Sequence, residues 1–455
     1  MRFKGAVLMV LKRKAYKHII DWKHNNKGKT ALLLNGARRV GKSYLAEYIG
    51  KNEYKSMIRI DFSNPPKDVI TIFENDSHDI PLFLTKLSLF YQVRLHVRDS
   101  LIIFDEVQLY PKARQLIKHL VADGRYDYIE SGSLLSLKEN IRDILIPSEE
   151  EEIEIHPLDF EEFLLALGDD ITVSFLRECY TQKKPLGQAL HRRVMNSFRV
   201  YMLVGGMPQA VIEYATSQNF ESTDSIKRNI LALYRRDIAK YAGAYKQKVT
   251  AIYDNLPGQL SKKEKRYKLS SIDKEARFRA YEDAFMWLAD GMIVNPCYNA
   301  TDPHFGLSLS MDHTTQKIYM ADTGLLVTHA FKNHTFTGNA LYKAILFDKL
   351  NVNEGMLMEN IVSQMLRVNG HRLFFYSRVD KNNRENHMEI DFLITHKNKI
   401  SPIEVKSSFY KKHSSLDKFM NRFASKLSES FILYQKDLMH KDGVTHLPIY
   451  MAMFL

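Results

Sequence analysis

Residues 36–43 read Gly-Ala-Arg-Arg-Val-Gly-Lys-Ser and complete the pattern G-x-x-x-x-G-K-[ST]. An apolar run at 31–34 leads into this stretch, and a helical pattern at 44–50 leaves it. A strand, a glycine-rich loop and a helix in this order are what a phosphate cradle requires, because the loop N–H groups and the helix N-terminus surround an anion. The stretch therefore predicts a phosphate-binding loop. The alternative is a basic glycine turn before a helix.

The residues of this loop have distinct expected roles. Gly36 and Gly41 supply backbone freedom where a phosphate must come close. Lys42 can reach the β- and γ-phosphates, and the Ser43 hydroxyl can ligate Mg²⁺. We therefore expect ATP and Mg²⁺ as cofactors, with the nucleotide held by Gly36, Ala37, Arg38, Arg39, Val40, Gly41, Lys42 and Ser43.

A second apolar run, at 101–104, ends in Asp105 and Glu106. Buried strands rarely end in two acids, because carboxylates are costly to desolvate unless a metal ion or another cation meets them. We expect Asp105 to hold the Mg²⁺ shell and Glu106 to orient and deprotonate the attacking water. A plain strand followed by an acidic turn is the alternative.

Other polar residues could complete an ATPase site. The next strand ends in Ser131-Gly132-Ser133, and either serine could contact the γ-phosphate or the lytic water, although Ser-Gly-Ser is also a common turn. Arg235 and Arg236 could supply an arginine finger, whereas arginine pairs on helices are usually salt-bridged.

Strand and helix patterns alternate through the first 160 residues. Strands are predicted at 31–34, 57–62, 101–104, 126–129 and 151–155, and helices at 44–50, 81–97 and 112–122. This alternation predicts an α/β fold with a parallel sheet covered on both faces. Ligands of such sheets bind beyond the carboxyl ends of the strands, which is where the glycine-rich loop lies.

The composition is that of a soluble globular protein, with 455 residues, 45% hydrophobic and 26% charged, enough for about three domains. The two cysteines, Cys179 and Cys297, lie far apart, which favours a reducing cytoplasm and excludes a thiolate zinc site within the chain. The apolar run at 6–11 is too short for an export signal, and no stretch is long enough to span a bilayer. A cytoplasmic protein without a membrane partner is expected.

The net charge of +12 and the isoelectric point near 9.3 favour polyanionic partners such as DNA. Basic residues gather at 1–30, 225–280 and 397–426, whereas 149–152 is a run of four glutamates. Lysine-rich surfaces are also common on solvated faces, so both interpretations stay open.

Two strand-like runs near the C-terminus, at 388–394 and 402–406, flank a polar turn at 396–399. A regular hairpin closed by this turn pairs residues whose numbers sum to 795, which sets Asp391 opposite Glu404 and Glu389 opposite Lys406. Two facing carboxylates repel unless a divalent cation lies between them. The pattern predicts the Asp…Glu-x-Lys site of a metal-dependent phosphodiesterase. The alternative is a solvated face with surface ion pairs.

The chain resembles a prokaryotic family of AAA-type P-loop ATPases whose C-terminal half carries a restriction-endonuclease-like domain. The shared motifs are the loop at 36–43, Ile-Ile-Phe-Asp-Glu-Val-Gln at 102–108, Ser-Gly-Ser at 131–133, His-Pro-Leu at 156–158 before Phe163, Gly-Gly-Met-Pro at 205–208, Met-Ala-Asp-Thr-Gly-Leu at 320–325 and Glu-Ile-Asp-Phe-Leu at 389–393.

This resemblance implies an ATPase core at 1–160, a helical lid at 161–245, a winged-helix-like module at 246–330 and a restriction-endonuclease-like domain at 331–455. From the residues alone, the middle segment suits a winged helix or any connector equally. The resemblance adds Glu359 to Asp391 and Glu404 as a further metal ligand, with Lys406 beside them to stabilise a phosphate or a hydroxide.

The favoured interpretation is an ATP-hydrolysing protein whose nucleotide state controls a nucleic-acid-facing, nuclease-like C-terminal domain. The alternatives are a STAND-like signalling or defence switch with slow turnover, an ATP-gated metal-dependent nuclease, and a nucleotide-binding scaffold for protein partners. A homo-oligomer is compatible with each.

Overall fold

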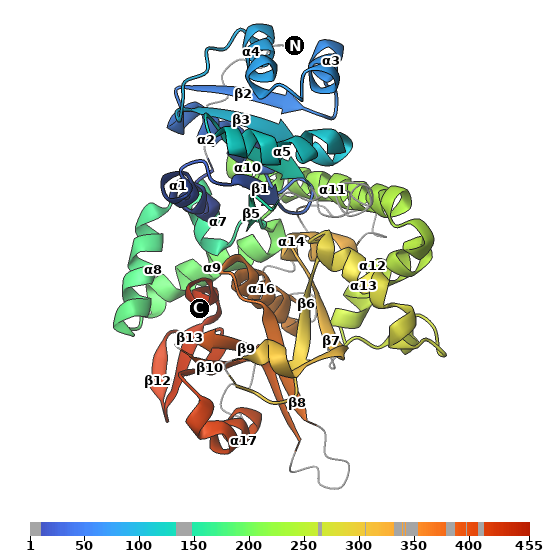
Figure 1. The fold of residues 1–455 in the computed structure, drawn as a ribbon. Coiled ribbons are helices and arrows are strands. Elements are labelled where there is room, and N and C mark those ends of the chain that lie inside the picture. The colour runs from blue at the N-terminus through green and yellow to red at the C-terminus, as the bar shows by residue number, and fades with distance from the viewer. Residues whose placement is uncertain are drawn as a thin grey trace. The chain divides into compact units, whose positions relative to one another are not determined.

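The computed structural model describes residues 11–132, 148–262, 266–304, 306–331, 339, 342, 354–378, 387–396, 398–407 and 414–455. The chain divides into two compact units, one formed by Lys12–His156 and the other by Pro157–Leu455 together with Met1–Leu11. Each unit has its own sheet, one of five strands and one of eight strands (Figure 1).

The Lys12–His156 unit is built on a parallel sheet in the order β2-β3-β4-β1-β5, which confirms the predicted parallel sheet. Each predicted strand overlaps one observed strand. The elements in chain order are α1 (Lys14–Asn26), β1 (Ala31–Asn35), α2 (Lys42–Glu53), β2 (Ser56–Asp61), α3 (Lys67–Asn75), α4 (Ile80–Tyr91), β3 (Ser100–Asp105), η1 (Val107–Leu109), α5 (Pro111–Asp123), β4 (Asp127–Gly132) and β5 (Glu150–Glu154).

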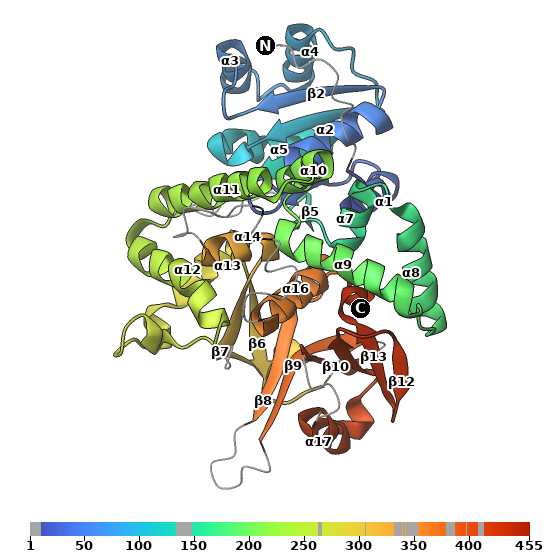
Figure 2. The same ribbon diagram turned by 180° about the vertical axis from the view of Figure 1, so that it is seen from behind.

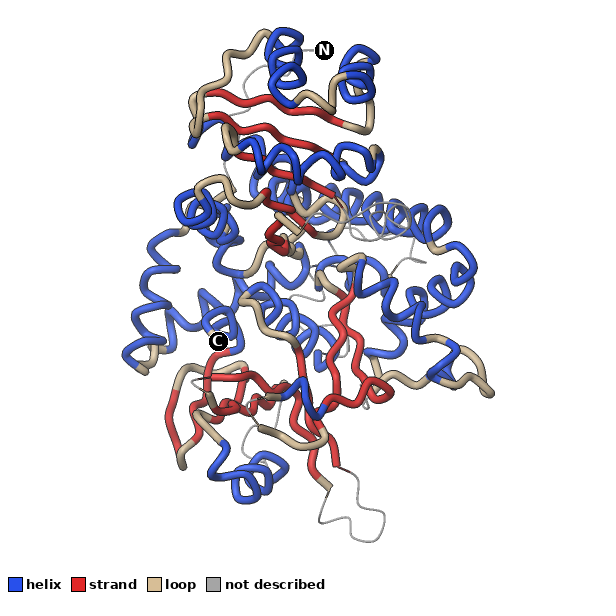
Figure 3. Tube along the Cα trace, viewed as in Figure 1, coloured by secondary structure: helices blue, strands red, loops and turns tan. Residues whose placement is uncertain are grey.

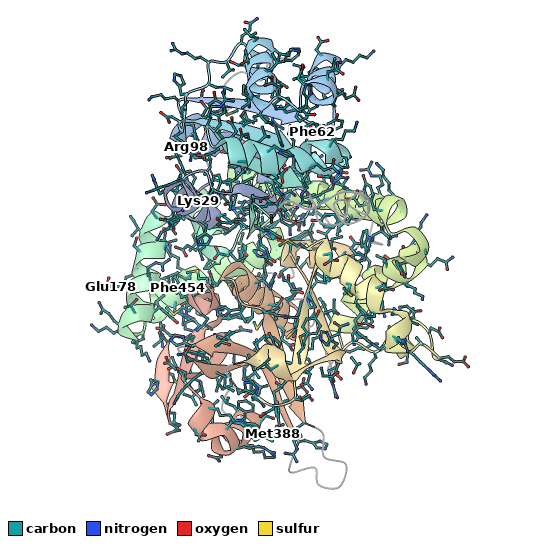
Figure 4. All side chains as sticks on the ribbon, viewed as in Figure 1. Lys29, Phe62, Arg98, Glu178, Met388 and Phe454 are labelled. Atoms are coloured by element: carbon teal, nitrogen blue, oxygen red, sulfur yellow. The ribbon has the colours of Figure 1, made fainter. Side chains whose placement is uncertain are left out.

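Helices cover both faces of this sheet (Figures 1 and 2). Crossovers between parallel strands are right-handed, so α2 lies on one face while α3, α4 and α5 share the other. On the second face Phe62, labelled in Figure 4, contacts the rings of Phe73, Phe104 and Tyr110 at centroid distances of 5.6, 5.8 and 5.3 Å. This aromatic core fixes the strand ends that carry the candidate site.

The helix predicted at 81–97 is shorter in the structure. Asp79 caps α4 by accepting the Leu82 N–H at 3.0 Å, and α4 ends at Tyr91 because Gln92 adopts a left-handed φ of 54°. Helix α3 is missing from the prediction, although its buried Val69, Ile72 and Phe73 follow a helical period.

The Pro157–Leu455 unit begins with five helices, α7 (Phe160–Ala166), α8 (Asp170–Gln182), α9 (Gln188–Val204), α10 (Pro208–Ser217) and α11 (Phe220–Tyr241). The Gly-Gly-Met-Pro motif falls at the break between α9 and α10, with Pro208 as the first residue of α10. Next along the chain come α12 (Lys246–Leu260), η3 (Leu269–Ser271), η4 (Phe278–Ala280), α13 (Glu282–Asp290), β6 (Val294–Ala300), η5 (Leu307–Ser310), β7 (Met311–Met320) and α14 (Thr323–Ala330).

The remaining described elements complete a mixed eight-stranded sheet in the order β12-β13-β11-β10-β9-β8-β6-β7, drawn in red in Figure 3. They are α16 (Glu354–Val368), β8 (Leu373–Arg378), β9 (Met388–His396), β10 (Lys399–Val405), α17 (Ser414–Phe423), η7 (Ala424–Lys426), β11 (Ser430–Tyr434), β12 (Met439–Lys441), β13 (Val444–Pro448) and η8 (Ile449–Phe454).

The middle segment is joined to the C-terminal segment by this sheet. Within the middle segment β6 and β7 pair antiparallel, and β6 also pairs in parallel with β8 through Cys297↔Leu373 and the next two residues. The expected domain boundary at 330 therefore divides strands that belong to one sheet. The β6–β7 hairpin is part of that sheet and does not form the wing of a separate winged-helix module. Sequence pattern could not reveal this, because the pairing joins strands more than 70 residues apart.

The predicted hairpin register is confirmed. Strand β9 pairs with β10 from Lys399↔His396 to Ile403↔Phe392, and every pair sums to 795. Ile390, Phe392 and Ile403 are buried, as expected of the core face.

Three of the motifs quoted above meet in the core of the second unit. The Leu158 N–H donates to the Gly206 carbonyl at 2.7 Å, and the Gly206 N–H donates to Asp322 at 2.6 Å. Asp322 also caps α14 by accepting the Leu325 N–H at 2.8 Å. These motifs therefore hold together the start of the unit, the α9–α10 break and α14.

No helix in the part of the chain that the structure describes is long and apolar enough to cross a membrane.

Candidate ATPase site and C-terminal carboxylate cluster

The predicted phosphate-binding loop connects β1 to α2 at the carboxyl end of the sheet. Gly41 adopts a φ of 95°, a left-handed conformation that favours glycine. At Gly36 a Cβ atom would lie only 2.4 Å from the Ile155 carbonyl oxygen, so only glycine lets the loop approach β5 this closely. The two glycines are thus required by the backbone.

Lys42 lies inside this loop with 7% of its surface exposed. Its ammonium donates to the carbonyl oxygens of Gly36 and Ala37 at 2.8 and 3.0 Å. Burial lowers the pKa of Lys42 to about 8, although the charges of Glu106 and Asp105 act in the opposite direction. The amino group is therefore held where a phosphate would meet it.

Asp105, the last residue of β3, is contacted from the start of α2 and from the end of β4. Its carboxylate, 1% exposed, accepts a hydrogen bond from the Ser43 hydroxyl at 2.7 Å and another from the Ser131 hydroxyl. The structure thus brings together Lys42, Ser43, Asp105 and Ser131, as predicted. A hydroxyl and a carboxylate are hard oxygen donors, so Ser43 and Asp105 fit a magnesium ion.

Arg59 on β2 is a site residue that sequence reasoning missed. Its guanidinium contacts Asp105 Oδ2 through Nε at 3.1 Å and Nη2 at 2.5 Å, and it also contacts Glu47 at 3.3 Å. The contact arises because β2 lies beside β3 in the sheet. No local motif identifies Arg59, because a sequence pattern does not show which strands are neighbours in the sheet.

Glu106 follows Asp105 in a left-handed conformation, with a φ of 55°. Such backbone is uncommon for a residue other than glycine and persists where other contacts hold it. Here the Glu106 N–H donates to Ser131 Oγ at 3.3 Å, and Gln108 Nε2 donates to its carboxylate at 2.5 Å. This turn points the two neighbouring acids to different environments, with Glu106 the more exposed.

The contacts of Asp105 and Glu106 do not include the remaining predicted ATPase residues that the structure describes. Ser133 lies outside the described residues. Arg235 on α11 pairs with Asp254, as the salt-bridge alternative expects. Arg236 is exposed.

The second predicted site is a cluster of carboxylates in the Pro157–Leu455 unit. Asp391 on β9 accepts the Val405 N–H at 2.9 Å, and the Lys406 ammonium pairs with Glu404. Glu359 on α16 accepts the Tyr319 hydroxyl at 2.9 Å. Three of the carboxylates in this region, Glu359, Glu389 and Asp391, share one buried partner, and we call these three the carboxylate cluster.

Lys317 on β7 lies at the centre of this cluster and was missed by the sequence reasoning. Its side chain is fully buried, with Nζ 3.1 Å from Glu389, 3.5 Å from Asp391 and 4.0 Å from Glu359. Burial acts to lower the pKa of Lys317, but these three carboxylates outweigh it and hold the pKa above its ordinary value. The sequence feature that could have identified Lys317 is its position as the only charged residue in the otherwise apolar run 317–320.

The predicted metal ligands Glu359, Asp391 and Glu404 do not fit a metal ion in this arrangement. Among the residues placed by the structure, no group of three or more His, Cys, Asp or Glu side chains is arranged to hold one. The Lys317 ammonium lies 4.0 Å from Glu359 and 3.5 Å from Asp391, and Glu404 is paired with Lys406 instead.

Comparisons with known proteins agree with the first site. Residues 28–164 match the family model described as AAA domain. Residues 195–335 and 354–451 match two models described only as domains of unknown function, DUF8612 and DUF4143. No curated protein matches the chain.

Solved structures with some similarity include ORC1 and DnaA proteins and a signal transduction ATPase. The Aeropyrum pernix ORC1 protein in complex with DNA is 12% identical, with 71% of this chain and 93% of that chain covered and a TM-score of 0.25. AMPPCP-bound DnaA from Aquifex aeolicus is 14% identical, with 74% and 93% covered and a TM-score of 0.26.

The third is a signal transduction ATPase with numerous domains from Pyrococcus horikoshii, which carries a tetratricopeptide repeat sensor. It is 11% identical, with 80% of this chain and 49% of that chain covered and a TM-score of 0.27. The AAA domain match and the geometry of the loop, Asp105 and Ser131 together identify residues 28–164 as a P-loop ATPase domain.

Proposed function

We propose that this chain binds ATP with Mg²⁺ and hydrolyses it. The observation that carries the proposal is the convergence of Lys42, Ser43, Asp105 and Ser131 at the carboxyl end of one parallel sheet. Lys42 would bind the β- and γ-phosphates, and Ser43 with Asp105 would hold the magnesium ion. The ion supplies charge neutralisation to the phosphates when it is bound.

The residues around Asp105 would carry the hydrolytic step. Glu106 accepts a proton from water as the water oxygen bonds to the γ-phosphorus, and the bond to the β–γ bridging oxygen breaks to give ADP and phosphate. Ser131, which already contacts both Asp105 and the Glu106 backbone, would orient the γ-phosphate or the water.

Two variants test this proposal. Lys42→Ala should abolish ATP binding or hydrolysis, and Glu106→Gln should bind ATP without turning it over. Lys51→Ala is a matched control, because Lys51 lies on the same helix with its side chain 62% exposed. Binding is measured by calorimetry and turnover by phosphate release. Normal hydrolysis by Lys42→Ala would contradict the proposal that this loop binds the phosphates of ATP.

A slow-turnover switch is a second candidate, and the Arg59–Asp105 ion pair favours it. A guanidinium that holds the metal-binding carboxylate must yield before the ion can bind, which would slow the cycle. A single-turnover burst followed by slow release of ADP is expected of the switch. Fast steady-state hydrolysis that duplex DNA stimulates would favour a motor-like ATPase instead.

We propose further that the nucleotide state acts on the second unit. The last residues of the Lys12–His156 unit lie next to the start of the phosphate-binding loop, where the Ile155 N–H donates to the Asn35 carbonyl at 2.6 Å. Arg13 connects the two ends by donating to the Val40 and His156 carbonyls at 2.9 and 2.6 Å. ATP turnover with and without duplex DNA tests whether nucleic acid is the partner. Plasmid cleavage that disappears in Asp391→Ala would favour the nuclease alternative.

A further inference from the structure

The carboxylate cluster is compensated by a cation that belongs to the chain itself. Lys317 reaches it from β7, while Glu389 and Asp391 come from β9 and Glu359 from α16. The three carboxylates thus meet one ammonium within 4.0 Å. These residues are far apart in the chain and meet at one site, where Lys317 is buried and Glu389 is partly exposed.

The surroundings of Lys317 leave it little freedom. Its side chain is completely buried, Cys297 opposite it on β6 is also buried, and its ammonium lies 5.1 Å from the centre of the Phe375 ring. Among the described residues, Lys317 Nζ meets no acceptor in good hydrogen-bonding geometry, so its contacts with the carboxylates are ionic. A buried amine aimed into a set of acids is costly unless those acids neutralise it.

A divalent cation would need the space that the ammonium fills. Mg²⁺ binds carboxylate oxygens at about 2.0–2.1 Å. The Lys317 ammonium lies 3.1–4.0 Å from oxygens of Glu389, Asp391 and Glu359, so an ion bonded to the same three carboxylates would lie against the ammonium and be repelled by its charge. The tethered ammonium also competes without the loss of translational freedom that a free ion incurs. Lys317 therefore has the advantage as long as its side chain stays in place.

We propose that Lys317 is the built-in cation of the carboxylate cluster and closes it against divalent metal ions. Without its amino group, the cluster becomes a site for a hard divalent cation that Glu359, Glu389 and Asp391 ligate. The wild-type cluster is then metal-free and generates no metal-bound nucleophile. This inference is independent of the proposed ATPase function, because every residue in it belongs to the second unit.

Calorimetric titration of the full chain with Mn²⁺, without nucleotide, tests the inference. The signal of the cluster is the part that Asp391→Asn removes. In wild type, Asp391→Asn should therefore leave the Mn²⁺ titration unchanged. Lys317→Met should bind Mn²⁺ at least tenfold more tightly than wild type. The double variant Lys317→Met/Asp391→Asn should return to the wild-type affinity. Lys317→Arg, which keeps the charge, is the matched control and should behave like wild type.

Two results would overturn the inference. One is Mn²⁺ binding by wild type that Asp391→Asn abolishes, and the other is a folded Lys317→Met protein that gains no Mn²⁺ affinity. If Lys317→Met does not fold, Lys317→Gln replaces it, because the amide can still bond to Glu389. Circular dichroism of each variant establishes that it is folded before titration.

Discussion

At the scale of single residues, Lys42 gives the ATPase site a defined pH dependence. Its pKa of about 8 arises from burial in the loop. The charged ammonium that binds phosphate prevails below this pH and is lost above it, so ATP affinity should be constant near pH 7. Above pH 8 it should fall, by up to about tenfold per pH unit. Titration calorimetry between pH 7 and 9.5 measures the decline.

Proton uptake distinguishes Lys42 from other causes of that decline. Bound phosphates raise the pKa of Lys42, and about three quarters of Lys42 is deprotonated at pH 8.5, so ATP binding at that pH should take up about three quarters of a proton. Calorimetry in two buffers of different ionisation enthalpy measures this number. Binding without proton uptake at pH 8.5 would contradict the assignment.

Arg59 is expected to restrain the metal-binding carboxylate. Arg59→Gln removes the ion pair with Asp105 and should tighten Mg²⁺·ATP binding about fivefold, which corresponds to about 1 kcal/mol for a partly exposed pair. Arg94→Gln, an exposed arginine of the same unit, should change nothing. Binding that weakens in Arg59→Gln would show instead that Arg59 assists the nucleotide.

Residues of the two candidate sites can be predicted from the sequence only where they belong to a local motif. Lys42, Ser43 and Asp105 follow from a loop and a strand end, and their positions agree with expectation. Arg59 and Lys317 act on residues of other strands, so their roles depend on which strands are neighbours. That order is fixed by packing of the whole sheet, which no local pattern records.

At the scale of elements, the register of the β9–β10 hairpin was predictable, although the strands extend to His396 and from Lys399 into the predicted turn. A short turn and opposite polar and apolar faces leave one register, since a slip by one residue would expose Ile390 and Phe392. The parallel pairing of β6 with β8 had no such signal. For this reason the hairpin was anticipated, whereas the extent of the sheet was not.

The break between α9 and α10 should tolerate no side chain at Gly206. A Cβ atom there would lie 2.0 Å from the Leu158 carbonyl oxygen and 2.7 Å from its nitrogen. Gly206→Ala should therefore lower the free energy of unfolding of this unit by about 2–4 kcal/mol, through overpacking and a lost hydrogen bond. Thermal and denaturant unfolding of full-length protein measure the change.

Gly258→Ala is the matched control for this substitution. Gly258 is exposed on α12, and a Cβ atom there meets nothing closer than 3.5 Å. Alanine in a helix should stabilise the protein by about 0.5 kcal/mol. Equal stability of the two variants would refute the close approach of Gly206 to Leu158.

At the scale of the whole molecule, the chain passes from the first unit into the second at His156–Pro157, the junction that follows the ATPase site in the sequence. His156 ends the first unit and Pro157 begins the second. On one side, Arg13 ties the His156 carbonyl to Val40 of the phosphate-binding loop. On the other, the Leu158 N–H is bonded to Gly206. A change in the loop therefore has a short route to the α9–α10 break.

Arg13→Gln should weaken this coupling while ATP binding persists, because Arg13 donates to the Val40 carbonyl of the loop and not to the N–H groups that would face phosphate. In wild type, ATP should slow hydrogen exchange at 157–166 and 204–208 as well as in the loop. In Arg13→Gln only the loop should respond. Lys17→Gln, exposed on α1, should respond like wild type. Exchange at 204–208 that still responds to ATP in Arg13→Gln would show that Arg13 does not transmit the nucleotide state, because the loop would then reach the second unit without it.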